Sequence, residues 1–354
     1  MLSEIQTESL QDLLTAVRSH ASPPGDTRIP SLDDYLSRHT AGPSLLNSGD
    51  VIEIQGPPAS GKTHLLYHFV LNCIMPSGGW NHSDFSPDVA GRCKSAIIYD
   101  MDLSFDIRRL HRLLLMRIAR LLPLSHESER AEYAEQSLRR LHIFRPTALL
   151  QLATSIKHLG QYHASNMPND EIGLLAVDSM STFYWSERFS AEQLGNIAPH
   201  KARNRTETAF IPPIYHVLTA IQSVRNSHGP LVIITNWGLN PVSQDHTAPN
   251  SAPLYKQHLR PFPVLTSVTH LGAKGAKDTD QLLLACPFPL ALHITLSSPS
   301  TAPFPSNAPP SDALRREAQH RKVNERGEVT GLVRCPGSWE IGRFTFNITN
   351  QDIV

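Results

Sequence analysis

Short apolar runs alternate with amphipathic stretches along the first two-thirds of the chain. The runs cover Val51–Ile54, Ser95–Asp102, Leu141–Phe144, Ile172–Val177 and Leu231–Thr235. Runs of about four to eight residues are typical of strands buried in a parallel sheet, whereas apolar residues spaced three or four positions apart are typical of helices. The alternation therefore predicts an α/β domain with a wound, mostly parallel sheet.

Helical periodicity is clear in four stretches between these runs. They are Ile107–Leu122, Glu127–Arg140, Thr147–Leu159 and Ile211–Val224. The first stretch carries five arginines, which we expect on a solvated helix face rather than on a DNA-binding surface. These are Arg108, Arg109, Arg112, Arg117 and Arg120.

Two helices are also predicted before the first strand. Apolar spacing indicates one over Leu2–His20 and another over Ile29–Leu36, with Ser31 as the N-cap of the second and acidic residues in its first turn. We interpret residues 1–40 as a short helical segment without a separate DNA-binding domain. Residues 41–350 are then the core.

The last part of the chain predicts antiparallel strands. Leu290–Leu296 is expected to be a strand, and Glu328–Cys335 and Gly342–Ile348 flank a Pro-Gly turn in a predicted hairpin. Pro- and Ser-rich, low-complexity insertions are expected near 239–273 and 297–312, the second of them disordered. The predicted fold is thus a mostly parallel wound sheet with antiparallel C-terminal strands.

The first strand leads into a glycine-rich loop that opens a helix, which is the context of a Walker A phosphate-binding loop. Gly56 and Gly61 allow backbone angles and close approaches that a Cβ would block. Free N–H groups and the helix dipole favour phosphate there, Lys62 would contact the outer phosphates, and the Thr63 hydroxyl would bind Mg²⁺. The predicted nucleotide-binding residues are Gly56, Pro57, Pro58, Ala59, Ser60, Gly61, Lys62 and Thr63.

An acidic residue, Asp178, directly follows the apolar run at 172–177, as in a Walker B strand. The carboxyl ends of parallel strands meet at one edge of the sheet, so Asp178 is expected beside the phosphate loop. A strand followed by Asp is common, so the assignment of Asp178 depends on the presence of the phosphate loop at residues 56–63. Together, Thr63 and Asp178 predict a Mg²⁺ site.

The composition of the chain argues against a strongly basic DNA-binding protein and against a membrane protein. Lys plus Arg equals Asp plus Glu at 32 each, so any DNA contact must come from a local patch or a partner. No apolar run is long enough to cross a bilayer and no signal peptide is recognisable, so we expect a soluble, intracellular protein. The 18 histidines lack metal-ligand spacing and are interpreted as mostly surface residues. Four cysteines without a CxxC pair are interpreted as buried free thiols: Cys73, Cys93, Cys286 and Cys335.

The sequence resembles the ATPase core of the eukaryotic RecA-like recombinases, in particular their small paralogues. The matching segments are LNSGDVIEIQGPPASGKTHLLYH, AIIYDMDLSFDIRRL, LLAVDSMSTFYW, LVIITNWG and GRFTFNIT, in the family's order and spacing over most of residues 29–348. The resemblance implies a RecA-like P-loop ATPase core that binds ATP and Mg²⁺. It also implies a nuclear role in homologous recombination, as a subunit that helps to load the main recombinase on single-stranded DNA.

Two positions depart from the family pattern. The resemblance places the water-activating Glu at Asp102 and the phosphate-sensing Gln at Trp237. Asp is one methylene shorter than Glu, so its carboxylate would stop about 1.5 Å short of the attacking water. An indole cannot replace a side-chain amide beside a γ-phosphate, because it has one donor and no acceptor. We therefore expect ATP binding with weak hydrolysis.

The resemblance also implies which proteins and nucleic acids the chain binds. Recombinases of this family polymerise through a Phe-containing motif upstream of the core, whereas no Phe precedes Phe69 here. The sequence therefore favours a place at one end of a hetero-oligomer, next to another paralogue, the D-type one. Single-stranded or branched DNA is the expected ligand of the protein or of its complex, and no membrane contact is expected.

Loops after the Walker B strand and after the strand at 231–235 line the DNA in the family. In the first of these loops Lys201, Arg203 and Arg205 are DNA-contact candidates, with a solvated loop as the equal alternative. Trp185 and Trp339 lie beside strands and are expected in the core rather than on a binding platform.

Two other functions remain open: a catalytic P-loop ATPase or small-molecule kinase, and a scaffold that does not use nucleotide.

Overall fold

The structure is a computed structural model, and it describes only part of the chain. The described residues are 24–39, 44–76, 91–121, 127–190, 193, 213–239, 255, 290–297, 309–312, 314–315, 327–336, 338, 340–349 and 351–353. The predicted helix at 2–20 and nearly all of the two predicted insertions lie outside them. The division at residue 40 stays a prediction.

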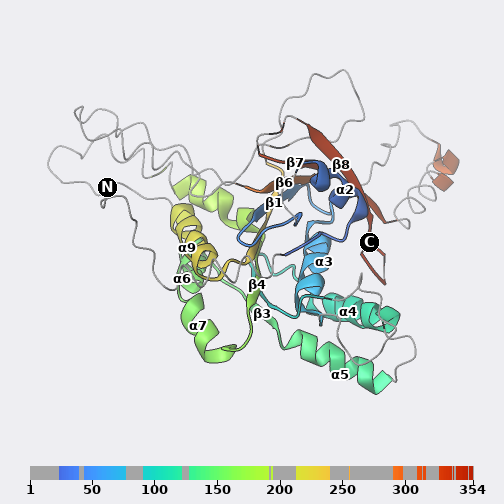
Figure 1. Cartoon of the computed structure of the whole chain (residues 1–354). Helices are drawn as coiled ribbons and strands as arrows, with labels where there is room; N and C mark the ends of the chain where they lie inside the picture. Colours follow the sequence, from blue (N-terminus) through green and yellow to red (C-terminus); the bar gives the residue numbers. More distant parts are fainter. Residues whose placement is uncertain are drawn as a thin grey trace.

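An eight-stranded sheet forms the centre of the molecule, with the order β3-β2-β4-β5-β1-β6-β7-β8 (Figure 1). Pairing is parallel from β3 to β6 and antiparallel between β6, β7 and β8. The strands are β1 (Val51–Gly56), β2 (Ser95–Asp100), β3 (Leu141–Phe144), β4 (Ile172–Asp178), β5 (Leu231–Trp237), β6 (Leu292–Leu296), β7 (Glu328–Arg334) and β8 (Ile341–Asn347). The predicted α/β fold, mostly parallel with antiparallel C-terminal strands, is confirmed.

Helices cover both faces of this sheet (Figure 1). One layer contains α2 (Pro30–His39), α3 (Lys62–Ile74), α4 (Ile107–Leu121) and α5 (Glu127–Leu138), and the other contains α6 (Leu149–Lys157), α7 (Leu159–Asn166) and α9 (Pro213–His228). Successive side chains of β1 point to opposite faces of the sheet. Ile52 and Ile54 pack in the core on the α3 side, whereas Val51 packs in the core on the side of α6 and α9. All three are fully buried.

Two predicted helices differ from the structure. Helix α2 begins at Pro30, which suits a first helical position, so Ser31 lies inside the helix and is not its N-cap. The Ser31 hydroxyl instead accepts a hydrogen bond from the Thr345 N–H and donates to the Thr345 carbonyl, both at 3.2 Å. The helix predicted over 147–159 corresponds to α6, which ends at Lys157. After a turn at His158 a second helix follows, α7, which was not predicted from the sequence.

Several polar side chains that were expected at the surface are buried. Arg117 points into the interior from α4, and His68 and His293 are each 2% exposed. The other arginines of α4 are exposed or half-buried, as the periodicity predicted. Buried charges and imidazoles need partners, and each of these three residues has them within the fold.

No described helix combines the length and hydrophobicity needed to cross a bilayer. No group of three or more His, Cys, Asp or Glu residues in the described part of the chain could hold a metal ion. Three of the four cysteines are described, and all three are free thiols. Cys73 is buried as predicted, whereas Cys93 and Cys335 are only half-buried, so the prediction of burial is wrong for these two.

Candidate nucleotide-binding site

The predicted phosphate loop connects the end of β1 to the start of α3. Gly61 has a φ of +90° at the N-cap of α3, a conformation that favours glycine. A Cβ on Gly56 would lie 2.4 Å from Ser60 Oγ and 2.7 Å from the Leu296 carbonyl oxygen. The loop backbone therefore requires glycine at both positions, and it delivers the unpaired N–H groups of a helix start to one point.

The Lys62 ammonium lies against the loop. Its Nζ donates to the carbonyl oxygens of Gly56, at 3.0 Å, and Pro57, at 2.8 Å. Burial lowers the pKa of Lys62, an effect that the nearby carboxylates of Asp178 and Asp102 oppose. The positive charge is thus placed at the loop, within the field of two acids at the same edge of the sheet.

Asp178 lies at the end of β4, and its side chain is almost completely buried. Its Oδ1 accepts a hydrogen bond from the Thr235 hydroxyl of β5. Burial raises the pKa of Asp178 to about 6, whereas the Thr235 and Thr63 hydroxyls lower it. Oδ2 is buried and has no hydrogen-bond partner among the described residues.

These oxygens suit a magnesium ion. Mg²⁺ prefers carboxylate and hydroxyl oxygens, and the buried Oδ2 of Asp178 is an acceptor near the Thr63 hydroxyl. A divalent cation would also stabilise the ionised carboxylate that burial disfavours. The residues present therefore fit the predicted Mg²⁺ site.

A cavity of about 380 Å³ opens beside the loop. It is lined by Ala59, Ser60, Gly61, Lys62, Thr63, His64, Tyr67, Ser104, Asp106 and Arg109. The last five of these residues come from α3, from the loop between β2 and α4, and from α4, and sequence reasoning missed them. The Tyr67 hydroxyl accepts a 2.8 Å hydrogen bond from the Asp106 N–H and so joins the two elements. Burial, and secondarily the charge of Arg109, lowers the pKa of His64.

The two acids at the end of β2 differ in environment. Asp100 is fully buried and accepts a hydrogen bond from the Phe105 N–H at 3.3 Å, and burial raises its pKa. Asp102 is exposed and accepts a 3.1 Å hydrogen bond from the Ser104 N–H. Asp102 is close enough to affect the pKa values of Lys62 and Asp178, so it lies beside the predicted site.

Trp237 ends β5 and is in register with Gly56 on the neighbouring strand. Its backbone N–H donates to Ser181 Oγ at 2.8 Å, and its side chain is 36% exposed. Asn236 points the other way, and its Nδ2 donates to the buried Glu53 Oε1 at 2.9 Å. The indole therefore lies at the same edge of the sheet as the phosphate loop.

The region predicted to contact DNA is only partly described. The three candidates Lys201, Arg203 and Arg205 lie outside the described residues. Trp185 was predicted to be in the core, which is wrong: it is 57% exposed, because it follows η2 (Met180–Phe183) beyond the end of β4. The Arg188 guanidinium carbon lies 5.9 Å from the centroid of its ring. Trp339 is outside the described residues.

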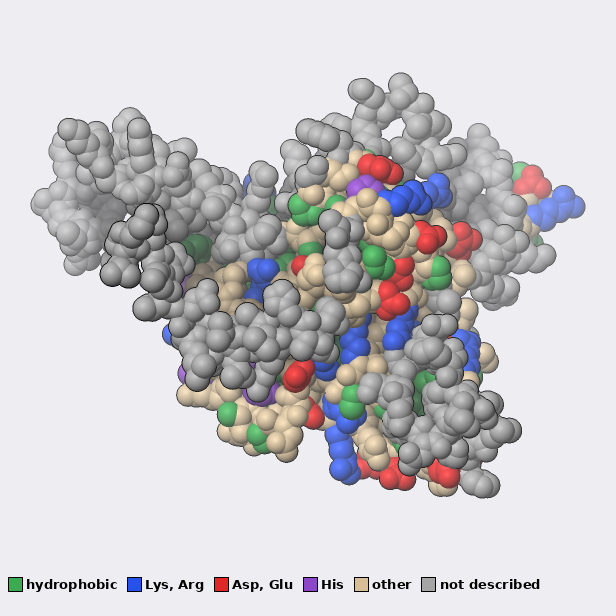
Figure 2. Space-filling view, in the orientation of Figure 1, with side chains coloured by type: hydrophobic (Ala, Val, Ile, Leu, Met, Phe, Trp, Pro, Cys, Tyr) green, Lys and Arg blue, Asp and Glu red, His purple; other side chains and the backbone are tan. Residues whose placement is uncertain are grey.

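Basic and acidic side chains are mixed on the described part of the face that Figure 2 shows. Figure 2 shows Lys and Arg side chains together with Asp and Glu side chains on the described part of the visible surface. This mixture agrees with the equal numbers of basic and acidic residues in the sequence. The described residues of this face therefore form no continuous basic surface for nucleic acid.

The chain is similar to two curated proteins. One is the "DNA repair protein XRCC2" of Mus musculus, 32% identical over 142 residues, which are 40% of this chain and 44% of that protein. The other is the "DNA repair protein XRCC2 homolog" of Arabidopsis thaliana, 25% identical over 216 residues, which are 54% of this chain and 55% of that protein. The chain thus spans about half the length of these relatives, and no family model matches it. The matches support the interpretation as an XRCC2-like RecA paralogue.

Proposed function

We propose that this chain is an ATP-binding recombinase paralogue that acts in homologous-recombination repair of DNA double-strand breaks. One observation carries the nucleotide part: Lys62, Thr63 and Asp178 lie at one edge of the sheet beside a cavity. The two relatives named as DNA repair proteins support the repair part. In this proposal the chain is a subunit of a nuclear paralogue complex that assists recombinase loading on single-stranded DNA.

The loop residues would bind the nucleotide through its phosphates. N–H groups at the start of α3 and the Lys62 ammonium face the cavity region and favour negative charge. Thr63 and Asp178 would hold Mg²⁺, which would neutralise phosphate charge when bound. The Lys62 ammonium donates to the carbonyls of Gly56 and Pro57, which places its charge at the loop.

Hydrolysis is proposed to be weak. Asp102 is near the site but has a shorter side chain than the Glu it would replace, and Trp237 places an indole where an amide would be needed. ATP then acts chiefly as a ligand that stabilises the competent form of the chain.

The proposed partners follow from the sequence resemblance. They are another paralogue, the D-type one, and single-stranded or branched DNA, contacted through Lys201, Arg203 and Arg205 by the chain or its complex. Replacing these three residues with Ala should lower the affinity of the chain, or of its complex, for single-stranded DNA. It should also make that affinity less dependent on salt concentration. An unchanged salt slope would reject them as contacts.

Equilibrium binding of ATP and ADP with Mg²⁺, followed by turnover on the same sample, tests the proposal. Lys62→Ala should abolish or strongly weaken binding, whereas Lys157→Ala, an exposed lysine on α6, should not. Tight binding with little turnover supports the assembly-subunit function. Turnover near the median for enzymes, lost in Lys62→Ala, would favour a catalytic ATPase or kinase, and absence of binding would favour a scaffold.

A further inference from the structure

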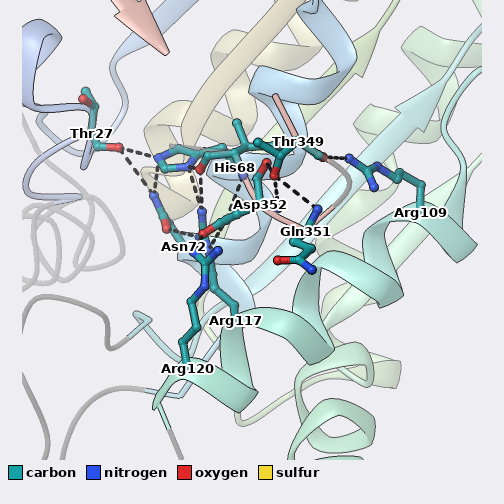
Figure 3. A network of polar contacts seen from close by, with 10 residues as sticks. Thr27, His68, Asn72, Arg109, Arg117, Arg120, Thr349, Gln351 and Asp352 are labelled. Carbon is teal, nitrogen blue, oxygen red and sulfur yellow. Dashed lines mark hydrogen bonds and ion pairs between the residues drawn. The ribbon is translucent and has the colours of Figure 1, made fainter. Parts of the chain in front are cut away.

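Residues near the C-terminus lie between the two helices that border the nucleotide cavity. We name Thr349 and residues 351–353 the C-terminal turn. Figure 3 shows it between α3 and α4, with the side chains of His68 and Arg117 directed toward it. The turn is therefore packed next to the helix that begins at Lys62 and the helix that carries Arg109.

On the α4 side, the turn is held by charge. Arg117 Nε lies 3.5 Å from Asp352 Oδ1, and the Arg120 guanidinium pairs with Oδ2 of the same carboxylate. The side chains of Arg117 and Asp352 are 9% and 8% exposed. A buried guanidinium without its carboxylate is costly, so this pair strongly favours the docked position of the turn.

On the α3 side, His68 completes the attachment. Its Nε2 lies 2.8 Å from the Thr27 carbonyl oxygen, and its Nδ1 lies 2.9 Å from Arg117 Nη2. The same Nδ1 lies 3.2 Å from the Ile353 carbonyl oxygen, so His68 also contacts the turn directly. His68 thus fixes Arg117, and Arg117 fixes Asp352.

The other end of the turn reaches the cavity. Thr349 Oγ1 accepts from the Asp352 N–H at 2.9 Å, and the Thr349 N–H donates to the Asp352 carbonyl at 2.9 Å. The Thr349 carbonyl oxygen accepts a hydrogen bond from Arg109 Nη2. Because Arg109 lines the cavity with Lys62 and Thr63, the turn contacts a cation of the proposed nucleotide site.

A second contact is made just before the turn. A Cβ on Gly61 would lie 2.9 Å from Ile348 Cδ1, so Ile348 packs directly on the phosphate loop. Ile348 is also paired with Ile353 in an antiparallel bridge. The loop and Arg109 are therefore both supported by the same short segment.

We infer that the C-terminal turn is a positioning element of the nucleotide site, which holds the Arg109 guanidinium at the cavity where its charge favours an anionic phosphate ligand. An arginine has several rotatable bonds, and ordering it in advance lowers the entropic cost of binding. The role of Asp352 and Thr349 is to place Arg109, not to contact nucleotide. The inference rests on the proposed ATP binding.

A double-mutant cycle with the full chain tests this role. Asp352→Asn should raise the Kd for Mg-ATP by roughly three- to tenfold, and Arg109→Ala by about tenfold. In the Arg109→Ala background, Asp352→Asn should have little further effect on Kd. Thr349→Val, which removes the hydroxyl that closes the turn, should act in the same direction as Asp352→Asn. Arg108→Ala, an exposed neighbour on α4, is the matched control and should leave Kd unchanged.

Thermal unfolding of each variant measures its stability. If Asp352→Asn acts only through stability, it should raise the Kd for Mg-ATP by the same factor with and without Arg109. An unchanged Kd in both the Asp352 and Thr349 variants, or equal losses with and without Arg109, would overturn the inference. If the unsubstituted chain does not bind Mg-ATP, the proposed function fails, and the inference fails with it. Binding by the unsubstituted chain with no effect of the turn overturns the inference alone.

Discussion

Arg117 on α4 and Asp352 near the C-terminus form an ion pair in the interior, with 3.5 Å between Nε and Oδ1. Arg117→Ala should lower the free energy of unfolding by about 3 kcal/mol, because it leaves Asp352 without its buried cation and Asn72 Oδ1 without the donor Arg117. Arg120→Ala removes a half-exposed partner of the same carboxylate and should cost less than about 1 kcal/mol. Urea unfolding at neutral pH compares the two, and equal losses would contradict the role of burial.

Asp178→Asn should separate stability from ligand binding. Burial raises the pKa of Asp178 to about 6, so its charge opposes folding increasingly as pH rises from about 4 to 6, and fully above that. Asn carries no charge and can still accept from Thr235, so the variant should be more stable at pH 7.5 by about 1 to 3 kcal/mol. The Mg²⁺-dependent part of ATP affinity should be lost. A destabilised variant, or one with unchanged Mg²⁺ dependence, would refute this assignment.

Stability should fall in mild acid because of His68. Burial, together with the charge of Arg117, lowers the pKa of His68 from an ordinary value of 6.5 to about 3. The unfolded chain therefore binds the proton first, and the stabilisation present above pH 6.5 is lost as pH falls toward 3. Between pH 7.5 and 5.0 this histidine should account for about 2 kcal/mol.

His68→Gln provides the comparison for this effect. Its unfolding free energy, measured with urea at both pH values, should fall less than that of the unsubstituted chain by about the same 2 kcal/mol. His293, whose pKa is also lowered to about 3, is present in both proteins and cancels. Equal pH dependence of the two chains would mean that His68 is not the titrating group.

The departures at Asp102 and Trp237 should limit hydrolysis. If so, Asp102→Glu combined with Trp237→Gln should raise ATP turnover by about tenfold or more, because positioned proton transfer contributes at least that much in enzymes. Asp102→Asn combined with Trp237→Gln is the control without a carboxylate and should show no gain. Single-turnover assays with purified chain measure both. No increase in the first variant would place the limit elsewhere.

The strands and the phosphate loop were predictable from sequence because their signals are local. The pattern that predicted β4 and Asp178 at its end lies within about ten residues. The same holds for the phosphate loop from Gly56 to Thr63. Parallel topology then brings Asp178 to the loop without further information.

Other parts of the site depend on contacts between distant segments. Arg109 resembles its exposed neighbours on α4 in sequence, and only the packing of α4 beside α3 places it at the cavity. Arg117 was assigned to a solvated face because its partner, Asp352, lies near the opposite end of the chain. Helical periodicity gives the face of a residue but not the polar groups that another segment brings to that face.

Ser31 illustrates a further consequence of such distant contacts. Strand β8 is at one edge of the sheet, where backbone N–H and C=O groups could pair with a strand of another molecule. The Ser31 hydroxyl occupies both groups of Thr345. A side chain expected to start a helix thus closes part of an open sheet edge, and so protects the protein there against edge-to-edge aggregation.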